Sequence, residues 1–334
     1  MTVLEHFLVL GAGAWGTALA LHLARQGHPV TLWGHDPEHL QLMHQTHLNQ
    51  AYLPDFPFPD NLIPCADLSG AFAQAGEQAI IFIVVPSHAF QETLKKIKPF
   101  LKPTTRILWA TKGLAENGEF LHVQCEQTLG HHPIAVLSGP SFAQEVAKAL
   151  PTAVTIATNN QAFGQALVTA FHSKYFRVYL SLDLIGVQLG GALKNVLAIA
   201  VGLSDGLGYG ANARAALITR GLAELCRLAL ILGADLSTLM GLSGVGDVVL
   251  TCTDNQSRNR RLGIAIAQKL TFSEIQQTIG KVLEGKDNVG YVRALAQHHQ
   301  IDMPISEQVY QVLFEGLSPE RAVENLLLRA PGLE

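Results

Sequence analysis

The stretch HFLVLGAGAWGTALALHLARQGHPVTLWGHD, residues 6–36, decides the fold of this chain. An apolar run leads into Gly11, Gly13 and Gly16, which form the pattern G-x-G-x-x-G. Residues 15–28 then follow a helical period, and residues 29–36 have the pattern of a second strand. Glycines in this pattern, between a strand and a helix, are typical of a dinucleotide-binding βαβ unit.

The rest of the first half continues the alternation of strands and helices, which predicts a mainly parallel sheet covered on both faces. Further strands are expected at 79–87, 105–113, 152–158 and 174–181, and residues 134–145 are expected to pass from a strand through a loop into a helix. A proline-rich stretch, 52–64, is predicted to be a surface excursion, and glycine-rich turns are expected at 202–210 and 241–246.

Beyond residue 182 almost every segment has a helical period. We therefore expect residues 1–182 to form a Rossmann-type doubly wound α/β domain, and residues 183–334 to form an all-α substrate and catalytic domain.

Composition excludes several classes of protein. With 334 residues, 48% of them apolar and 15% charged, the chain has material for two packed domains. A net charge of -4 without a long basic run argues against a nucleic-acid partner. The most apolar short run, residues 79–85, is too short for a membrane span.

The cysteines and histidines indicate a cytoplasmic protein without a metal site. Cys65, Cys125, Cys226 and Cys252 lack C-x-x-C spacing, which favours reduced thiols. No His/Cys/Asp cluster has the spacing of metal ligands, so no metal is expected.

In the glycine loop each glycine has a distinct role. Gly11 permits the tight turn, Gly13 lets the backbone approach a pyrophosphate, and Gly16 lets the helix approach the strand. After the second strand, His35 is a candidate partner for a 2′-phosphate, whereas Asp36 either bonds a ribose hydroxyl or caps the next helix. The cofactor is expected to be NADP(H) or NAD(H), with NADPH favoured.

Three strand ends carry candidate ligand-binding residues, because open α/β sheets bind ligands at the carboxyl ends of their strands. Pro86 and Ser87 follow the first of these strands. Lys112 suits an anionic substrate group, although a solvated lysine is the simpler interpretation. Gly139 and Ser141 lie in SGPSFAQE, where Ser141 and Gln144 have the spacing of a capping box.

Lys194 poses a separate question, because the helix around it is almost entirely apolar. Its side chain leans over Gly190 and Gly191, so the sequence suggests a vacant space for a ligand. A desolvated lysine exchanges a proton near neutral pH, and a ketone receiving a hydride needs one. Asn195 adds a second polar group. The alternative is a lysine that snorkels to solvent while the glycines serve helix packing.

The segment SGVGDVVLTCTDNQSRNRRLG, residues 243–263, has the features of a phosphate site. Ser257 is a predicted N-cap, and Arg258 follows at the positive end of a helix. Asp247 is a candidate to orient Lys194 or to bond a substrate hydroxyl. For Arg260 and Arg261 a charged helix face is the favoured interpretation.

Five motifs in this order resemble bacterial NAD(P)-dependent glycerol-3-phosphate dehydrogenases over about residues 7–290. These motifs are GAGAWG, ATKGL, SGPSFAQE, LKNVLAIAVGLSDGLGYGANARAALITRG and GDVVLTCTDNQSRNRRLG. The resemblance implies reduction of dihydroxyacetone phosphate to sn-glycerol 3-phosphate for phospholipid synthesis, and a homodimer.

It also implies a role for each matching residue. Lys194 would be the catalytic acid/base. Substrate would contact Lys112, Gly139, Ser141, Asp247, Ser257, Arg258 and Asn259, and the position of Lys194 and Asn195 in the apolar helix adds both to this set. Cofactor would contact the loop glycines together with Ala14, Trp15, His35, Lys112, Ala143, Arg258, Val282 and Glu284. In KVLEGK, Leu283 departs from the smaller residue usual in the family.

Two other functions fit parts of the pattern. A related dehydrogenase acting on a 3-hydroxy acid or a ketopantoate-like substrate would also use a lysine on the first helix of an all-α domain, but it would bind a carboxylate. A dinucleotide sensor without catalysis would have no need of Lys194.

Overall fold

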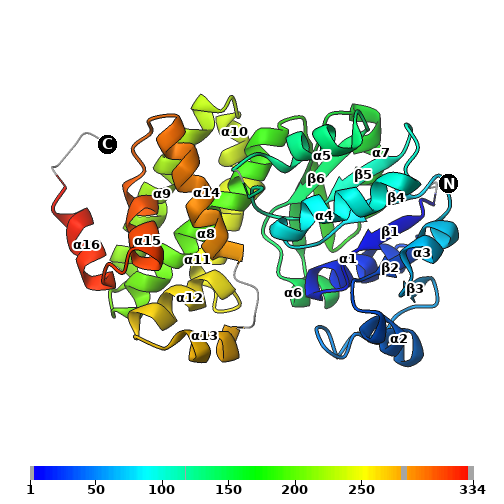
Figure 1. Cartoon of the computed structure of the whole chain (residues 1–334), viewed down its shortest axis with the longest axis horizontal. Helices are drawn as coiled ribbons and strands as arrows, with labels where there is room; N and C mark the ends of the chain where they lie inside the picture. Colours follow the sequence, from blue (N-terminus) through cyan, green and yellow to red (C-terminus); the bar gives the residue numbers. More distant parts are fainter. Residues whose placement is uncertain (1–3, 117, 280–283, 330–334) are drawn as a thin grey trace. The chain divides into compact units, whose positions relative to one another are not determined.

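The computed structural model describes residues 4–116, 118–279 and 284–329. Its backbone divides into two compact units (Figure 1). The first comprises residues 1–112 and 120–184, and the second comprises residues 113–119 and 185–334.

The first unit is built on an eight-stranded sheet with the order β3-β2-β1-β4-β5-β6-β7-β8. The first six strands are parallel, β7 runs antiparallel to β6, and β8 is parallel to β7. The strands are β1 (Phe7–Leu10), β2 (Val30–Trp33), β3 (Leu62–Cys65), β4 (Ile80–Ile83), β5 (Arg106–Trp109), β6 (Ile134–Ser138), β7 (Thr152–Thr158) and β8 (Phe176–Ser181).

Helices join most of these strands, as the apolar strand pattern predicts. They are α1 (Ala14–Arg25), α2 (Pro37–Thr46), α3 (Leu68–Ala75), α4 (Ser87–Ile97), α5 (Leu121–Leu129), α6 (Ala143–Ala147) and α7 (Gln161–Phe171), with a short 3₁₀ turn at Lys98–Phe100. The core includes Phe7, Phe82 and Phe171, whose rings make edge-to-face contacts at 5.7 Å.

The proline-rich connection between α2 and β3 is not simply a surface excursion. Leu53, Phe56 and Phe58 are at most 9% exposed, and they belong to the main apolar cluster of the first unit. Asn49 in the same connection is fully buried. Proline and aspartate suggested exposure here, but the apolar residues between them are anchored in the core.

All regular secondary structure in the described residues of the second unit is helical. Its helices are α8 (Leu184–Gly206), α9 (Ala211–Ile231), α10 (Leu236–Leu239), α11 (Asp247–Thr253), α12 (Arg258–Ala267), α13 (Phe272–Ile279), α14 (Glu284–His298), α15 (Pro304–Phe314) and α16 (Pro319–Leu327). A π-helical turn, Leu242–Gly246, leads directly into α11. The predicted fold class, a Rossmann-type sheet domain with an all-α domain, is confirmed.

Helix α8 is the core of the second unit, with every residue from Gly186 to Ser204 buried. It continues through Gly206, so the turn predicted from residue 202 begins later. Two segments, Leu184–Gly206 and Leu236–Thr253, have the length and hydropathy of a membrane span, and 89% of the qualifying window in the first is buried within the protein. A core helix of a globular domain meets the same criteria.

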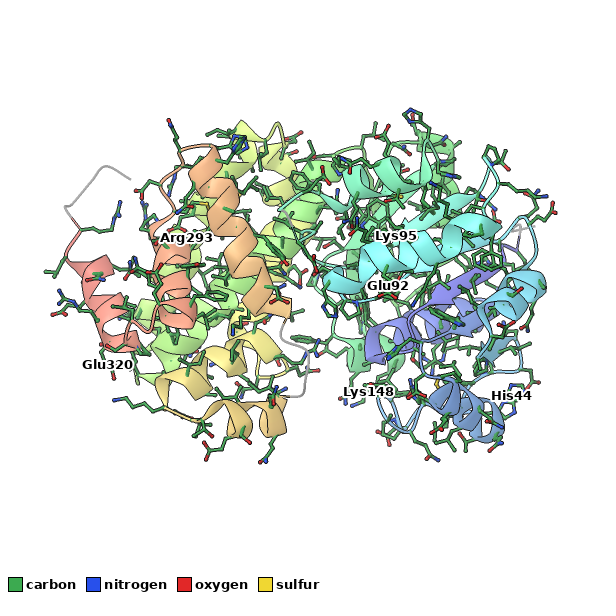
Figure 2. All side chains as sticks on the ribbon, viewed as in Figure 1. His44, Glu92, Lys95, Lys148, Arg293 and Glu320 are labelled. Atoms are coloured by element: carbon green, nitrogen blue, oxygen red, sulfur yellow. The ribbon has the colours of Figure 1, made fainter. Side chains whose placement is uncertain are left out.

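Charged side chains join the outer helices of this unit. Arg293, labelled in Figure 2, lies on α14, and its Nε bonds Glu307 Oε2 of α15 at 2.8 Å. On α9, Glu224 is only 2% exposed and accepts the N–H groups of Ile305 and Ser306 at the start of α15. Burial raises the pKa of the Glu224 carboxyl, while these hydrogen bonds act in the opposite direction.

Candidate active site

The glycine loop between β1 and α1 has the geometry that a dinucleotide pyrophosphate requires. Gly11 has a φ of 129°, and a Cβ there would lie 2.1 Å from the Val84 carbonyl oxygen. A Cβ on Gly16 would lie 1.8 Å from the Gly11 oxygen, whereas a Cβ on Gly13 would have no described atom within 4 Å. The space is therefore open only at Gly13, the position next to the expected phosphates.

The start of α1 offers donors to an anion. No side chain caps the helix at Gly13, so its first N–H groups and the positive end of the helix dipole face outward beside Ala14 and Trp15. The Trp15 indole Nε1 is buried and has no hydrogen-bond partner among the described residues. The residues present therefore fit a dinucleotide.

A buried asparagine supports this loop from behind. Asn49 Nδ2 donates to the Ala12 carbonyl oxygen at 3.0 Å and to Thr17 Oγ1 at 2.8 Å. Its Oδ1 accepts the Tyr52 N–H at 3.2 Å and lies 3.0 Å from His39 Nε2. The connection after α2 thus holds the glycine loop through one side chain.

The end of β2 separates the two hypotheses for Asp36. Its Oδ1 accepts the N–H groups of Glu38 and His39 at 3.1 and 3.2 Å, so Asp36 is the N-cap of α2. His35 is exposed beside it. The structure leaves His35 as the candidate partner for a 2′-phosphate at this strand end.

Lys112, Gly139 and Ser141 come together at the ends of β5 and β6. Lys112 Nζ donates to the Gly139 carbonyl oxygen at 2.8 Å, so the side chain is held rather than fully solvated. Ser141 Oγ donates to the same oxygen at 2.9 Å. The predicted capping box is wrong, because α6 begins after Phe142 without a side-chain cap, and Ala143 is its first residue.

In the second unit, Lys194 is 8% exposed and its Nζ bonds Asp247 Oδ1 at 2.6 Å. The ammonium group therefore does not snorkel to solvent. Asp247, at 1% exposure, begins α11 directly after the π-helical turn. Of the two roles expected for Asp247, this contact favours orientation of Lys194, since a buried pair at this distance is held by both charge and a hydrogen bond.

The space over Gly190 is filled, contrary to our expectation of a vacant site. A Cβ on Gly190 would lie 2.2 Å from the Ser243 carbonyl oxygen. The glycine allows the turn that precedes Asp247 to lie against α8 within one helical turn of Lys194. Gly190 therefore serves close packing that brings the lysine and the carboxylate together.

The start of α12 lies beside the next residue of α8. Asn259 Nδ2 donates to Asn195 Oδ1 at 2.8 Å. Ser257 caps the helix by accepting the Arg260 N–H at 3.2 Å, as predicted. Arg258 is exposed at the first helical position. A cation, helix N–H groups and an amide are thus placed next to the residue that follows Lys194.

The interpretation of Arg260 as part of a charged helix face is wrong. Arg260 is 7% exposed and pairs with Asp205 Oδ2 through Nη2 at 2.6 Å. It also bonds Asn255 Oδ1. Arg261 is only partly exposed, and its Nε is buried without a partner among the described residues. Of these three arginines, only Arg258 is an exposed residue.

Three further buried residues were not singled out from the sequence. Thr251 Oγ1, one helical turn after Asp247, donates to the Asp247 carbonyl oxygen at 2.6 Å. Cys252 is fully buried, and burial raises the pKa of its thiol to about 12, so it stays protonated. Asn288 accepts the Leu114 N–H at 3.1 Å. The spacing of Thr251 from Asp247 could have identified it; nothing in the sequence identified Asn288.

The remaining two predicted cofactor contacts are Val282 and Glu284. Val282 is outside the described residues. Glu284 begins α14, but its side chain is also outside what the structure describes. The next residue, Gly285, lies against the Asn259 side chain, since a Cβ there would be 2.0 Å from Asn259 Oδ1.

A dinucleotide loop on a doubly wound sheet, with a buried lysine–aspartate pair in a helical unit, defines an NAD(P)-dependent dehydrogenase. Comparison with known proteins identifies the family. The models for the NAD-dependent glycerol-3-phosphate dehydrogenase N-terminus and C-terminus match residues 7–164 and 183–324. The chain belongs to this family.

Its relatives match almost the whole chain. Two curated proteins named glycerol-3-phosphate dehydrogenase [NAD(P)+], from Photorhabdus laumondii and Escherichia coli strain K12 / DH10B, are 54% and 53% identical over 325 residues, which cover 96% of this chain and 95% of each relative. The crystal structure of glycerol-3-phosphate dehydrogenase from Coxiella burnetii has a TM-score of 0.94 at 50% identity, covering 98% of this chain and 99% of that one.

The fold alone is shared more widely. A ketopantoate reductase from Ralstonia eutropha has a TM-score of 0.60 at 19% identity, covering 96% of this chain and 100% of that one.

Proposed function

We propose that this protein reduces dihydroxyacetone phosphate to sn-glycerol 3-phosphate with NAD(P)H, reversibly, and so supplies the backbone for glycerophospholipids. The observation that carries the proposal is the buried Lys194–Asp247 pair, 2.6 Å apart, beside the Asn195–Asn259 bond at the start of α12. Reduction of a phosphorylated ketone requires a proton donor for the carbonyl oxygen and a binding site for the phosphate, and these two groups supply both.

Lys194 acts as the proton donor in this reaction. When bound, the reduced nicotinamide supplies a hydride to the carbonyl carbon. The carbonyl oxygen gains negative charge, and the Lys194 ammonium stabilises that charge and transfers a proton to it. Asp247 holds the ammonium in position, and Thr251 fixes the first turn of the helix that carries Asp247. In the reverse direction Lys194 accepts the proton.

The substrate phosphate is assigned to the start of α12. Arg258 is an exposed residue there, and Ser257 and Asn259 contribute the helix cap and an amide. Arginine suits phosphate because its fork of N–H groups matches two phosphate oxygens. Lys112, Gly139 and Ser141 are further proposed substrate contacts.

The cofactor is assigned to the glycine loop and the residues around it. The open space at Gly13 and the uncapped start of α1 favour the pyrophosphate, with Ala14 and Trp15 beside it. His35 is the proposed partner of a 2′-phosphate, so NADPH is the preferred cofactor. Lys112, Ala143, Arg258, Val282 and Glu284 complete the proposed set.

The two halves of the chain are proposed to have different functions. Residues 1–182 are proposed to bind the dinucleotide, and residues 183–334 to bind substrate and carry Lys194. We further propose that the protein acts in the cytoplasm as a homodimer. Sedimentation equilibrium of the purified chain tests the dimer, which a monomer mass at micromolar concentration would contradict.

The first test is the loss of reduced-nicotinamide absorbance with dihydroxyacetone phosphate, run beside unphosphorylated dihydroxyacetone. We expect rapid loss with the phosphorylated ketone only. No loss with either ketone, from protein that binds NADPH, would refute the proposal and point to a carboxylate substrate instead.

The second test concerns the proton donor. Lys194→Met is expected to lose most turnover while its Kd for NADPH stays unchanged. Lys269→Met, a surface lysine with a 77% exposed side chain in the same unit, is the control and keeps normal turnover. Normal turnover of Lys194→Met would exclude the assigned role.

A further inference from the structure

The last turn of α8 contains a buried acid that has no place in the proposed chemistry. Asp205 Oδ1 accepts from Arg214 Nε and Nη2 at 3.1 and 2.9 Å. Its Oδ2 accepts from Arg260 Nε and Nη2 at 2.9 and 2.6 Å. The Asp205 and Arg260 side chains are 7% and 9% exposed, so this pair is almost free of solvent screening.

An aspartate at this position is unfavourable for α8 itself, because the carboxyl end of a helix carries partial negative charge. Its two arginine partners offset that cost, and one of them, Arg260, is the third residue of α12. Each arginine uses two nitrogens on a single carboxylate oxygen, which restricts the direction of the guanidinium group. Asp205 therefore sets the direction in which α12 leaves α8.

Two further contacts hold the same helices together. A Cβ on Gly202 would lie 2.1 Å from the Arg260 carbonyl oxygen, so the α8 backbone lies directly on the first turn of α12. Closer to Lys194, Asn195 and Asn259 are hydrogen-bonded at 2.8 Å. Three contacts along α8 therefore hold the start of α12: the one at Asn195, the one at Gly202 and the one at Asp205. Of these, only the contact at Asp205 is an ion pair.

We propose that Asp205 is a positioning residue for the substrate phosphate. It does not touch the substrate; it holds Arg260, and through Arg260 the first turn of α12, so that Arg258, Asn259 and the helix N–H groups converge on one anion. This inference rests on the proposed function, because it deepens the role given to the start of α12.

Removing the charge has two effects of opposite sign on anion binding, and this makes the proposal testable. The loss of one negative charge near the phosphate would by itself tighten the binding of an anion. The loss of the paired geometry would weaken it, because a misplacement of about 1 Å can cost a factor of roughly 100. Weaker binding after neutralisation therefore reports position rather than charge.

The experiment compares Asp205→Asn with Glu224→Gln in the full-length protein. Glu224 is the matched control: it is also a buried acid of the helical unit, but it holds α15 instead of α12. Four quantities are measured: the KM for dihydroxyacetone phosphate, the inhibition constant of inorganic phosphate, the Kd for NADPH, and the melting temperature.

For Asp205→Asn we expect the KM for dihydroxyacetone phosphate and the inhibition constant of inorganic phosphate to rise together, by roughly tenfold or more. The Kd for NADPH stays unchanged. For Glu224→Gln we expect a lower melting temperature with all three constants unchanged. Tighter phosphate binding by Asp205→Asn, or a change in melting temperature alone, would overturn the proposal.

A second variant keeps the test decisive if Asp205→Asn folds poorly. Arg214→Gln removes the bonds to Oδ1 at a side chain that is already 32% exposed, and it leaves the Arg260 pair in place. It is expected to raise the same two constants by a smaller factor; unchanged constants in a folded Arg214→Gln would also contradict the positioning role. Failure of the proposed function is distinguishable, because the unsubstituted chain would then neither reduce dihydroxyacetone phosphate nor be inhibited by phosphate.

Discussion

Substitution of Gly190 by alanine tests whether close packing of α8 creates the catalytic pair. The new methyl group would lie 2.2 Å from the Ser243 oxygen, 2.9 Å from the Ser243 carbonyl carbon and 3.3 Å from Gly244 Cα. Non-bonded heavy atoms rarely approach closer than roughly 3.2 Å, so the turn must move away from α8 by about 1 Å. Asp247 lies three residues after Gly244 and moves with the turn.

The consequences for stability and for rate differ in size. Overpacking costs roughly 1–3 kcal/mol, whereas alanine gains about 1 kcal/mol over glycine inside a helix. The net loss of unfolding free energy should therefore be about 0–2 kcal/mol. The Nζ–Oδ1 distance, now 2.6 Å, would lengthen to about 3.6 Å, beyond hydrogen-bond range. A misplacement of this size should lower kcat by roughly 10- to 100-fold.

The assay measures kcat for dihydroxyacetone phosphate and the free energy of urea unfolding. The control is Gly290→Ala on α14, where a Cβ would have no described atom within 4 Å and where alanine should stabilise the helix without changing kcat. The reasoning would be refuted if Gly190→Ala lost stability but kept the kcat of the unsubstituted chain.

Three other substitutions test the pairing of Lys194, the cofactor preference and the pH dependence of stability. Asp247→Asn keeps the shape but removes the charge beside Lys194, so kcat should fall roughly a hundredfold with an unchanged Kd for NADPH; an unchanged kcat would contradict the pairing. His35→Asp should lower the ratio of kcat/KM for NADPH over NADH by at least about tenfold, because a carboxylate repels the 2′-phosphate; a constant ratio would mean that another group binds it. Burial lowers the pKa of His22 from 6.5 in the unfolded chain to about 4 in the folded chain. Between these two pH values only the unfolded chain binds a proton at His22, so the free energy of unfolding decreases as the pH falls from 6.5 towards 4. From pH 7 to pH 5 the loss due to His22 is about 2 kcal/mol, and His22→Gln, which keeps a donor for the Phe171 oxygen, should remove that part of the pH dependence; equal pH slopes by urea unfolding would contradict it.

Local patterns predicted the features that depend on neighbouring residues in the sequence. The alternation of apolar strands and helices predicted the mainly parallel sheet and the all-α second half. The glycine spacing predicted the turn before α1, and Ser257 before a helical run predicted an N-cap. Lys194 in an apolar helix indicated a buried charge, and Asp247 was the acid proposed to orient it.

Features that depend on distant partners were not predictable in this way. Arg260 is buried because Asp205, 55 positions away in the sequence, pairs with it. Gly190 looked like an opening because its neighbour, Ser243, comes from a turn with no helical or strand period. Ser141 had the right spacing for a cap, but its hydroxyl donates to the Gly139 carbonyl oxygen instead. Each error concerns a contact that periodicity does not encode.

The four contacts of the Asn49 side chain restrict where members of this family can gain or lose residues. Connections between secondary-structure elements usually tolerate insertions and are favoured places for new chain ends. The connection after α2 should not, because one residue more or less would pull Asn49 from the Ala12 carbonyl oxygen and from Thr17. Insertions between α2 and β3 should therefore be rare unless they fall after Phe58, where the chain has already left the core.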